Sequence, residues 1–290
     1  MSDKQKAFLS IFLYSSLGAA IAAATKMGLS QIPPLSFAFA RFLLASIIIT
    51  PYVWKKRSYL LFDIKTLGPL SLLASLNIIF FVLGIKLTTA NISQILYGAV
   101  PIVVGILVHF IYKEKLSLRK LLGIIVGFIG VLLVLLLPIW QKGKFSGDFL
   151  GNILVALAVL SWSLYMVLSK KAQATHSPFR IVSIFILVTT ILLFPFFLVE
   201  SAYNFGWWNG LSLDSILTII YVAVIGTITT YFLNQYSIRH GGAVFASLSF
   251  YLSPIFGFVI AFWLLGERLT WGLGIGAILA LLGVYITTKK

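Results

Sequence analysis

Long apolar segments follow one another along the chain and are separated by short stretches that contain charged residues, proline or glycine. A helix needs roughly 20 apolar residues to cross the hydrocarbon core of a bilayer, so segments of this length predict spanning helices rather than core strands. Ten segments meet this condition: about 8–28, 35–54, 67–86, 91–111, 118–137, 148–169, 179–199, 214–237, 243–264 and 271–287. The pattern therefore predicts an all-α integral membrane protein with ten transmembrane helices.

The composition agrees with this pattern and excludes a soluble globular protein. Of the 290 residues, 60% are hydrophobic and 10% are charged, and the mean hydropathy is +1.05. Ten spans take up about 200 residues, so the remaining chain is too short for a soluble domain. The chain has no cysteine and three scattered histidines. This predicts neither a disulfide nor a metal site, and we expect no cofactor.

The net charge of +15 arises from 22 lysines and arginines against seven acids. Most of the basic residues lie between the apolar segments, where they orient helices and contact anionic lipid headgroups. We therefore expect the lipid bilayer, and no nucleic acid, as a partner. If the N-terminus is cytoplasmic, sixteen basic residues lie on that side and five on the outer side, while Arg41 lies within the second segment. This bias predicts cytoplasmic termini in a multi-pass protein of the cell membrane.

The second half of the chain repeats features of the first at a constant displacement of 153 positions. The matched residues are Pro101, Glu114, Leu116, Gly123 and Gly130 in the first half and Pro254, Glu267, Leu269, Gly276 and Gly283 in the second. We predict two repeats of five helices, residues 1–140 and 141–290. Five is an odd number of spans, so the second repeat is inverted. Inverted repeats are common in secondary transporters, whose substrate sites lie near the middle of the bilayer.

The order of these motifs resembles the ten-helix, EamA-type branch of the drug/metabolite transporter superfamily over the whole chain. The matching features are Lys26, Pro33 and Pro34 followed by Arg41, Pro101, Lys113-Glu114-Lys115-Leu116, Ser161-Trp162, Pro254 and Gly266-Glu267-Arg268-Leu269. The chain departs from many relatives at Ser15-Ser16-Leu17-Gly18, where they carry a tryptophan. The resemblance implies an exporter-like carrier of amino acids or comparable metabolites.

Polar and aromatic side chains in the middle of the segments are costly to expose to lipid, so we expect them to face one another or a cavity. Aromatic rings combined with a few amide and hydroxyl groups suit a small amphipathic solute. The predicted substrate-binding residues of this kind are Tyr14, Asn77, Phe81, Tyr97, Trp162, Tyr165, Tyr231, Asn234 and Tyr251. The alternative is that these groups hydrogen-bond one another between packed helices.

Two cations, Lys26 and Arg41, lie toward the outer ends of the first two segments. Either could meet an anionic group of a substrate, whereas Lys26 could instead reach the headgroups or bind carbonyl groups at a helix end. Arg41 lies deeper, so we include it among the predicted substrate-binding residues. Pro101 and Pro254 each remove a backbone hydrogen bond, and the matched kinks that they predict could form a gate.

These features together predict a secondary transporter with a small-molecule substrate, and not an enzyme. The spans contain no paired acids, histidine cluster or nucleophile with a base. The predicted cargo is an amino acid or a related amphipathic solute, exported by alternating access as the two halves rock around a central cavity. The alternative is a flippase for a lipid or a lipid-linked headgroup. Glycine pairs such as Gly123 and Gly127 predict close helix packing, within one subunit or in a homodimer.

Overall fold

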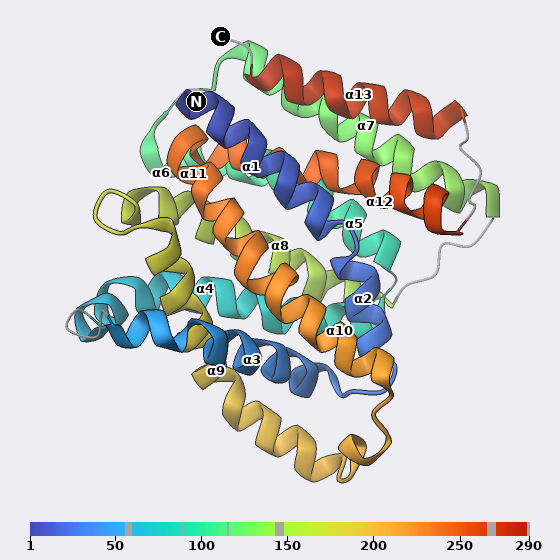
Figure 1. Cartoon of the computed structure of the whole chain (residues 1–290). Helices are drawn as coiled ribbons and strands as arrows, with labels where there is room; N and C mark the ends of the chain where they lie inside the picture. Colours follow the sequence, from blue (N-terminus) through green and yellow to red (C-terminus); the bar gives the residue numbers. More distant parts are fainter. Residues whose placement is uncertain (56–59, 89, 115, 143–147, 266–270, 289–290) are drawn as a thin grey trace.

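The computed structural model describes residues 1–55, 60–88, 90–114, 116–142, 148–265 and 271–288. Within these ranges every regular element is a helix (Figure 1). The predicted matches at Glu267 and Leu269 lie outside the described residues, as does Lys115.

The helices vary in length, and several are too short to cross a bilayer alone. They are α1 (Asp3–Gly18), α2 (Ile21–Gly28), α3 (Pro34–Lys55), α4 (Leu60–Leu87), α5 (Ala90–Gly98), α6 (Val100–Tyr112), α7 (Leu118–Lys142), α8 (Phe149–Ala172), α9 (Pro178–Tyr203), α10 (Leu213–Ala223), α11 (Thr230–Ser247), α12 (Ser249–Leu265) and α13 (Trp271–Thr288). A short 3-10 helix, Trp207–Gly210, precedes α10.

Six helical stretches of the described chain are long and apolar enough to cross a membrane. They are Pro34–Lys55, Asp63–Leu87, Ile92–Tyr112, Phe149–Ala172, Pro178–Tyr203 and Leu213–Ser247. A shorter apolar helix covers Gly274–Thr288. The prediction of an all-helical membrane protein is therefore confirmed.

Two of the predicted spans are built from two shorter helices. The predicted span 8–28 is divided into α1 and α2, and the predicted span 91–111 is divided into α5 and α6. Pro101 is the second residue of α6, where its missing N–H costs no hydrogen bond within the helix. Pro254 has a different position, because α12 continues through it. The two matched prolines therefore do not stand at matched helix breaks.

The chain also departs from regular helix around α11. Six residues of π-helix, Val224–Thr229, join α10 to α11. Gly242 has φ 82° and ψ 169°, a backbone conformation that is essentially restricted to glycine. The chain turns there, so the predicted spans 214–237 and 243–264 meet at this residue.

Helices from the two halves of the sequence pack most closely where both carry glycine. α7 and α13 lie side by side along one edge of the molecule (Figure 1). A Cβ atom on Gly283 would lie 2.4 Å from Cα of Gly127, so the two backbones touch. α4 and α8 make a second contact of this kind, since a Cβ atom on Gly84 would lie 3.0 Å from the carbonyl oxygen of Gly151. The close approach that the glycine spacing predicts thus occurs within one chain.

Polar groups add further links between the halves. The hydroxyls of Ser46 and Thr190 lie 2.7 Å apart, and so do those of Ser75 and Thr189. Glu200 accepts a hydrogen bond of 2.6 Å from the backbone N–H of Ser36, in the first turn of α3, where the helix dipole favours an anion. The two halves are therefore interleaved.

The ends of the chain lie together. Nζ of Lys4, in the first turn of α1, lies 3.4 Å from the carbonyl oxygen of Thr288, the last residue of α13. Near them, His240 binds the carboxylate of Asp3 at 2.9 Å. The hydrogen-bonded ends bring the first and last helices to the same side of the molecule.

Candidate functional site

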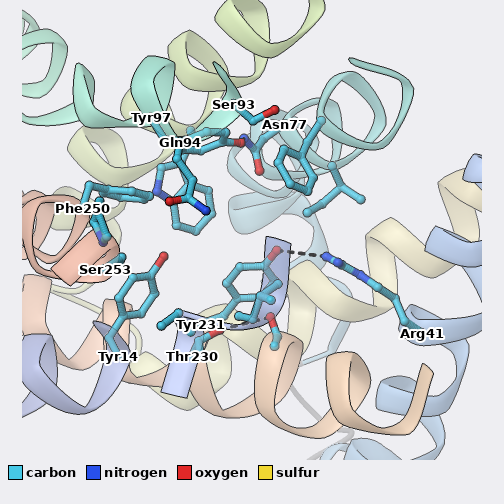
Figure 2. A pocket seen from close by; sticks show the side chains of 18 residues that line it. Tyr14, Arg41, Asn77, Ser93, Gln94, Tyr97, Thr230, Tyr231, Phe250 and Ser253 are labelled. Atoms are coloured by element: carbon cyan, nitrogen blue, oxygen red, sulfur yellow. Dashed lines mark hydrogen bonds between the residues drawn. The ribbon is translucent and has the colours of Figure 1, made fainter. Parts of the chain in front are cut away.

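A cavity of about 150 Å³ lies among helices of both sequence halves (Figure 2). Its wall combines aromatic and small residues with a few hydroxyl and amide groups and one arginine. The lining residues are Tyr14, Gly18, Ala19, Ile21, Arg41, Asn77, Ile78, Phe81, Ser93, Gln94, Tyr97, Trp162, Gly226, Thr230, Tyr231, Phe250, Ser253 and Pro254. Two of the departures from regular helix border it, namely the break after α1 and the π-helical turn before α11. Such breaks bring backbone and side chains from different helices to one hollow.

Four aromatic rings from four helices form one side of the wall. The ring centroids of Tyr14 and Phe250 lie 6.0 Å apart, those of Phe250 and Tyr97 5.6 Å, and those of Tyr97 and Phe81 5.7 Å. Stacked and edge-on rings at these distances attract one another, so they hold a fixed surface. The result is a broad apolar surface against which the hydrocarbon part of a solute can pack.

Asn77 anchors the polar part of the wall. Its amide nitrogen donates to the hydroxyl of Tyr97 at 2.7 Å and to the backbone carbonyl of Ala158 at 2.8 Å. The second bond reaches from α4 to α8, the helix pair that the contact between Gly84 and Gly151 draws together. Because both amide hydrogens are used by the protein, the amide oxygen is the atom of Asn77 that remains for a donor on a solute.

Arg41 enters the wall from α3 and is only 2% exposed. Its Nη2 donates to the hydroxyl of Tyr231 at 3.2 Å (Figure 2), and its Cζ lies 4.9 Å from the ring centroid of Phe42. Its Nε has no hydrogen-bond partner among the residues that the structure describes.

Trp162 and Tyr231 complete the wall beside Arg41. Their ring centroids lie 5.5 Å apart, and the ring of Tyr231 also packs edge-on against Phe185 at 4.9 Å. The indole nitrogen of Trp162 is buried and has no partner in the described part of the chain. This nitrogen is a free donor beside the cavity.

Most of the residues predicted from the sequence come together in this wall. They are Tyr14, Arg41, Asn77, Phe81, Tyr97, Trp162 and Tyr231, together with Pro254. Asn77 and Tyr97 line the cavity and also hydrogen-bond each other. The two alternatives, a position facing a cavity and a hydrogen bond between packed helices, therefore both apply to this pair.

Four predicted residues lie outside the wall. Tyr165 is fully buried behind Trp162 and packs on Phe185. Tyr251 points the other way from its neighbour Phe250 and donates to the carbonyl of Ile124 on α7 at 2.8 Å. Asn234 is 2% exposed, and neither atom of its amide has a partner among the described residues. Pro101 is buried at the start of α6. Successive residues of a helix point about 100° apart, so a shift of one position moves a side chain out of the wall.

Several lining residues were not among those predicted from the sequence. Gln94 lies three residues before Tyr97, and Ser253 lies three residues after Phe250, so each shares a helix face with a ring of the wall. Residues three apart on a helix share a face, so the prediction of Tyr97 could have identified Gln94 as well. Phe250 and Ser253 carry no such signal, because the direction of their helix is set by the turn at Gly242 and by the new start of α12 at Ser249.

Lys26 has a different role from Arg41. Its Nζ donates to the backbone carbonyls of Ile85 and Thr88, each at 2.8 Å, at the end of α4. Lys86 returns a similar bond to the carbonyl of Leu29 at 2.9 Å. Of the alternatives left open for Lys26, the structure shows the binding of carbonyl groups at a helix end.

Comparisons with known proteins agree over the whole chain. The EamA-like transporter family matches it twice, over residues 5–136 and 149–289. An uncharacterized transporter of Archaeoglobus fulgidus is 27% identical over 277 residues, which cover 91% of this chain and 91% of that protein. The uncharacterized transporter YdfC of Bacillus subtilis is 27% identical over 271 residues, which cover 91% of this chain and 85% of that protein.

A solved crystal structure has 17% sequence identity and a TM-score of 0.74, with coverage of 98% of this chain and 95% of that chain. At this identity the likeness concerns the fold alone. The family match, the named relatives and the apolar helices agree with one another. The chain therefore belongs to the EamA-like transporter family and is a multi-pass membrane transporter of the drug/metabolite type.

Proposed function

We propose that this transporter exports an amino acid or a related amphipathic solute by alternating access around the cavity. The observation that carries the proposal is the cavity wall, in which a row of aromatic rings faces a small set of polar groups. Rings supply contact area for a hydrocarbon side chain, while the oxygen of Asn77 and the guanidinium of Arg41 supply orientation. A volume of about 150 Å³ suits a small metabolite.

We further propose ten spans in two inverted repeats, 1–140 and 141–290, with cytoplasmic termini. The double family match and the contact between Lys4 and Thr288 support this topology. Because α7 and α13 touch through their backbones, the moving body that includes them contains helices from both repeats. The helix breaks beside the cavity supply places where such bodies can bend.

The topology can be tested by cysteine labelling, because the chain has no cysteine of its own. The matched positions Glu114→Cys and Glu267→Cys are made as single variants and exposed to a membrane-impermeant maleimide on intact cells. We expect labelling of the Glu267→Cys variant on intact cells, and of the Glu114→Cys variant only after permeabilisation. Ala174→Cys serves as a control, because the proposed topology places it on the same side as Glu114. It should therefore also be labelled only after permeabilisation. Labelling of both matched positions from the same side would contradict the inverted repeat.

Transport can be tested with purified protein in liposomes and radiolabelled aromatic and aliphatic amino acids. We expect uptake by the native chain, and a rate per folded protein that is about tenfold lower for Asn77→Ala and Trp162→Ala, because each loses an oriented contact. The matched controls Asn204→Ala and Trp208→Ala lie outside the wall and should keep the native rate. Equal rates in all four variants would remove Asn77 and Trp162 from the site.

A further inference from the structure

The charges around the cavity are unbalanced. Arg41 lines it, and no aspartate or glutamate is among the lining residues that the structure describes. Placing a guanidinium inside a membrane protein is costly unless an anion or a set of acceptors compensates it. In the described part of the chain Arg41 has one hydrogen bond, to a neutral tyrosine, and its Nε has none.

The described acids are engaged elsewhere or lie at helix ends. Asp63 binds Arg180 and His176, and Glu114 binds Lys170. The others are Asp3 beside His240, Asp148 at the N-cap of α8 and Asp214 in the first turn of α10. Glu200, near the end of α9, binds the backbone N–H of Ser36 at the start of α3. No described carboxylate therefore forms an ion pair with Arg41.

Lys26, the other cation near the outer ends of the first two predicted spans, does not share this imbalance. Both cations lie on neighbouring helices of the same half, but the ammonium of Lys26 binds two backbone carbonyls at 2.8 Å. Lys26 is also absent from the cavity wall. Its charge is thus compensated by the fold, whereas that of Arg41 faces the hollow.

The partner of Arg41 adds a second donor. The hydroxyl of Tyr231 accepts the bond from Arg41 and keeps its own hydrogen for another acceptor. A guanidinium edge and a phenol hydrogen beside it form a two-point receptor for a carboxylate, with charge-assisted hydrogen bonds. In Figure 2 a dashed line joins the two groups on one side of the hollow, and Asn77 and Tyr97 lie on its other side.

We infer that the cavity selects a solute by its carboxylate, which binds Arg41 and Tyr231 while the apolar part of the solute packs on the row of aromatic rings. This inference rests on the proposed transport function and adds a charge rule to it. Among its described residues the wall offers an ammonium group neutral acceptors, such as the oxygens of Asn77, Gln94 and Ser253, and no carboxylate. A carboxylate without an ammonium group is therefore preferred to a zwitterion, and an amine without a carboxylate is the least favoured.

Three probes with the same phenyl group separate these cases: 3-phenylpropionate, phenylalanine and phenethylamine. Their binding to the purified native protein is measured by thermal shift and by inhibition of uptake in liposomes. A charge-assisted hydrogen bond changes affinity by about tenfold to a hundredfold, so we expect 3-phenylpropionate to bind at least about tenfold more tightly than phenethylamine. Equal affinity for these two probes in the native protein would overturn the inference, and this test needs no variant.

Arg41→Gln tests the residue itself, with the exposed Arg239→Gln as a matched control. We expect Arg41→Gln to weaken 3-phenylpropionate about tenfold or more and to leave phenethylamine unchanged, and Arg41→Lys to restore part of the preference. An equal loss for all three probes would indicate a purely structural role and would overturn the assignment. If no probe and no amino acid is transported, the proposed function fails. If the amine is transported as well as the carboxylate, the charge rule alone fails.

Discussion

The pair α7–α13 and the cavity wall are both contacts between the two halves of the sequence, but they are built from opposite kinds of residue. In the pair, Gly127 and Gly283 let the two backbones touch, with no side chain between them at that point. In the wall, Tyr14, Phe250 and Tyr97 hold their helices apart with large rings.

This difference shows how one chain combines a tightly packed helix pair with a helix contact that encloses a cavity. Lipid is as apolar as the helix surface, so helices in a membrane associate through close packing rather than through the hydrophobic effect. The glycine contact maximises such packing. The wall has less of this packing. Two of its buried polar atoms, Nε of Arg41 and Nε1 of Trp162, have no partner in the described chain. A site for a solute needs polar groups of this kind. The free energy that their burial costs is offset by close packing elsewhere, as in the pair α7–α13.

The largest effect is expected from a side chain placed between the backbones of α7 and α13. A side chain on Gly283 would meet Cα of Gly127 at 2.4 Å, which is backbone and cannot give way. We expect Gly283→Leu to destabilise the fold by about 3 kcal/mol or more and to abolish transport. Thermal unfolding and gel filtration in detergent measure this effect. Gly257→Ala, with no described atom within 4 Å of its Cβ, is the control and should behave as the native chain. A Gly283→Leu variant with the native melting temperature would show that the two backbones need not touch.

A smaller effect, an increase in stability, is expected at Asn234, which lies just outside the cavity wall. Asn234 is buried with both amide atoms unpaired in the described chain, so its burial costs free energy. We expect Asn234→Leu to raise stability by about 1 kcal/mol, measured as a higher melting temperature. The neighbouring Gln235 accepts a hydrogen bond of 2.6 Å from Gln173, so Gln235→Leu should lower stability. Destabilisation by both variants would show that Asn234 has acceptors of its own.

Much of the cavity was predictable from the sequence, because an aromatic or polar group in the middle of a span has few places to lie. Asn77, Tyr97 and Trp162 were identified in this way. Tyr251 was predicted in place of Phe250, since spacing along one helix does not carry across the turn at Gly242 and the start of α12. The same limit applies to Tyr165, whose ring lies one layer behind Trp162.

The sequence by itself determined the membrane-spanning helices and the repetition of motifs, because apolar length and residue spacing are properties of the chain alone. Only the tertiary structure decided which of the two cations, Lys26 or Arg41, binds backbone carbonyls. The carbonyls that bind Lys26 lie at the end of α4, 59 and 62 positions away in the sequence, and no local pattern brings them to it. Arg41 has one hydrogen bond in the described chain, to the hydroxyl of Tyr231, and none at its Nε, so its charge faces the cavity.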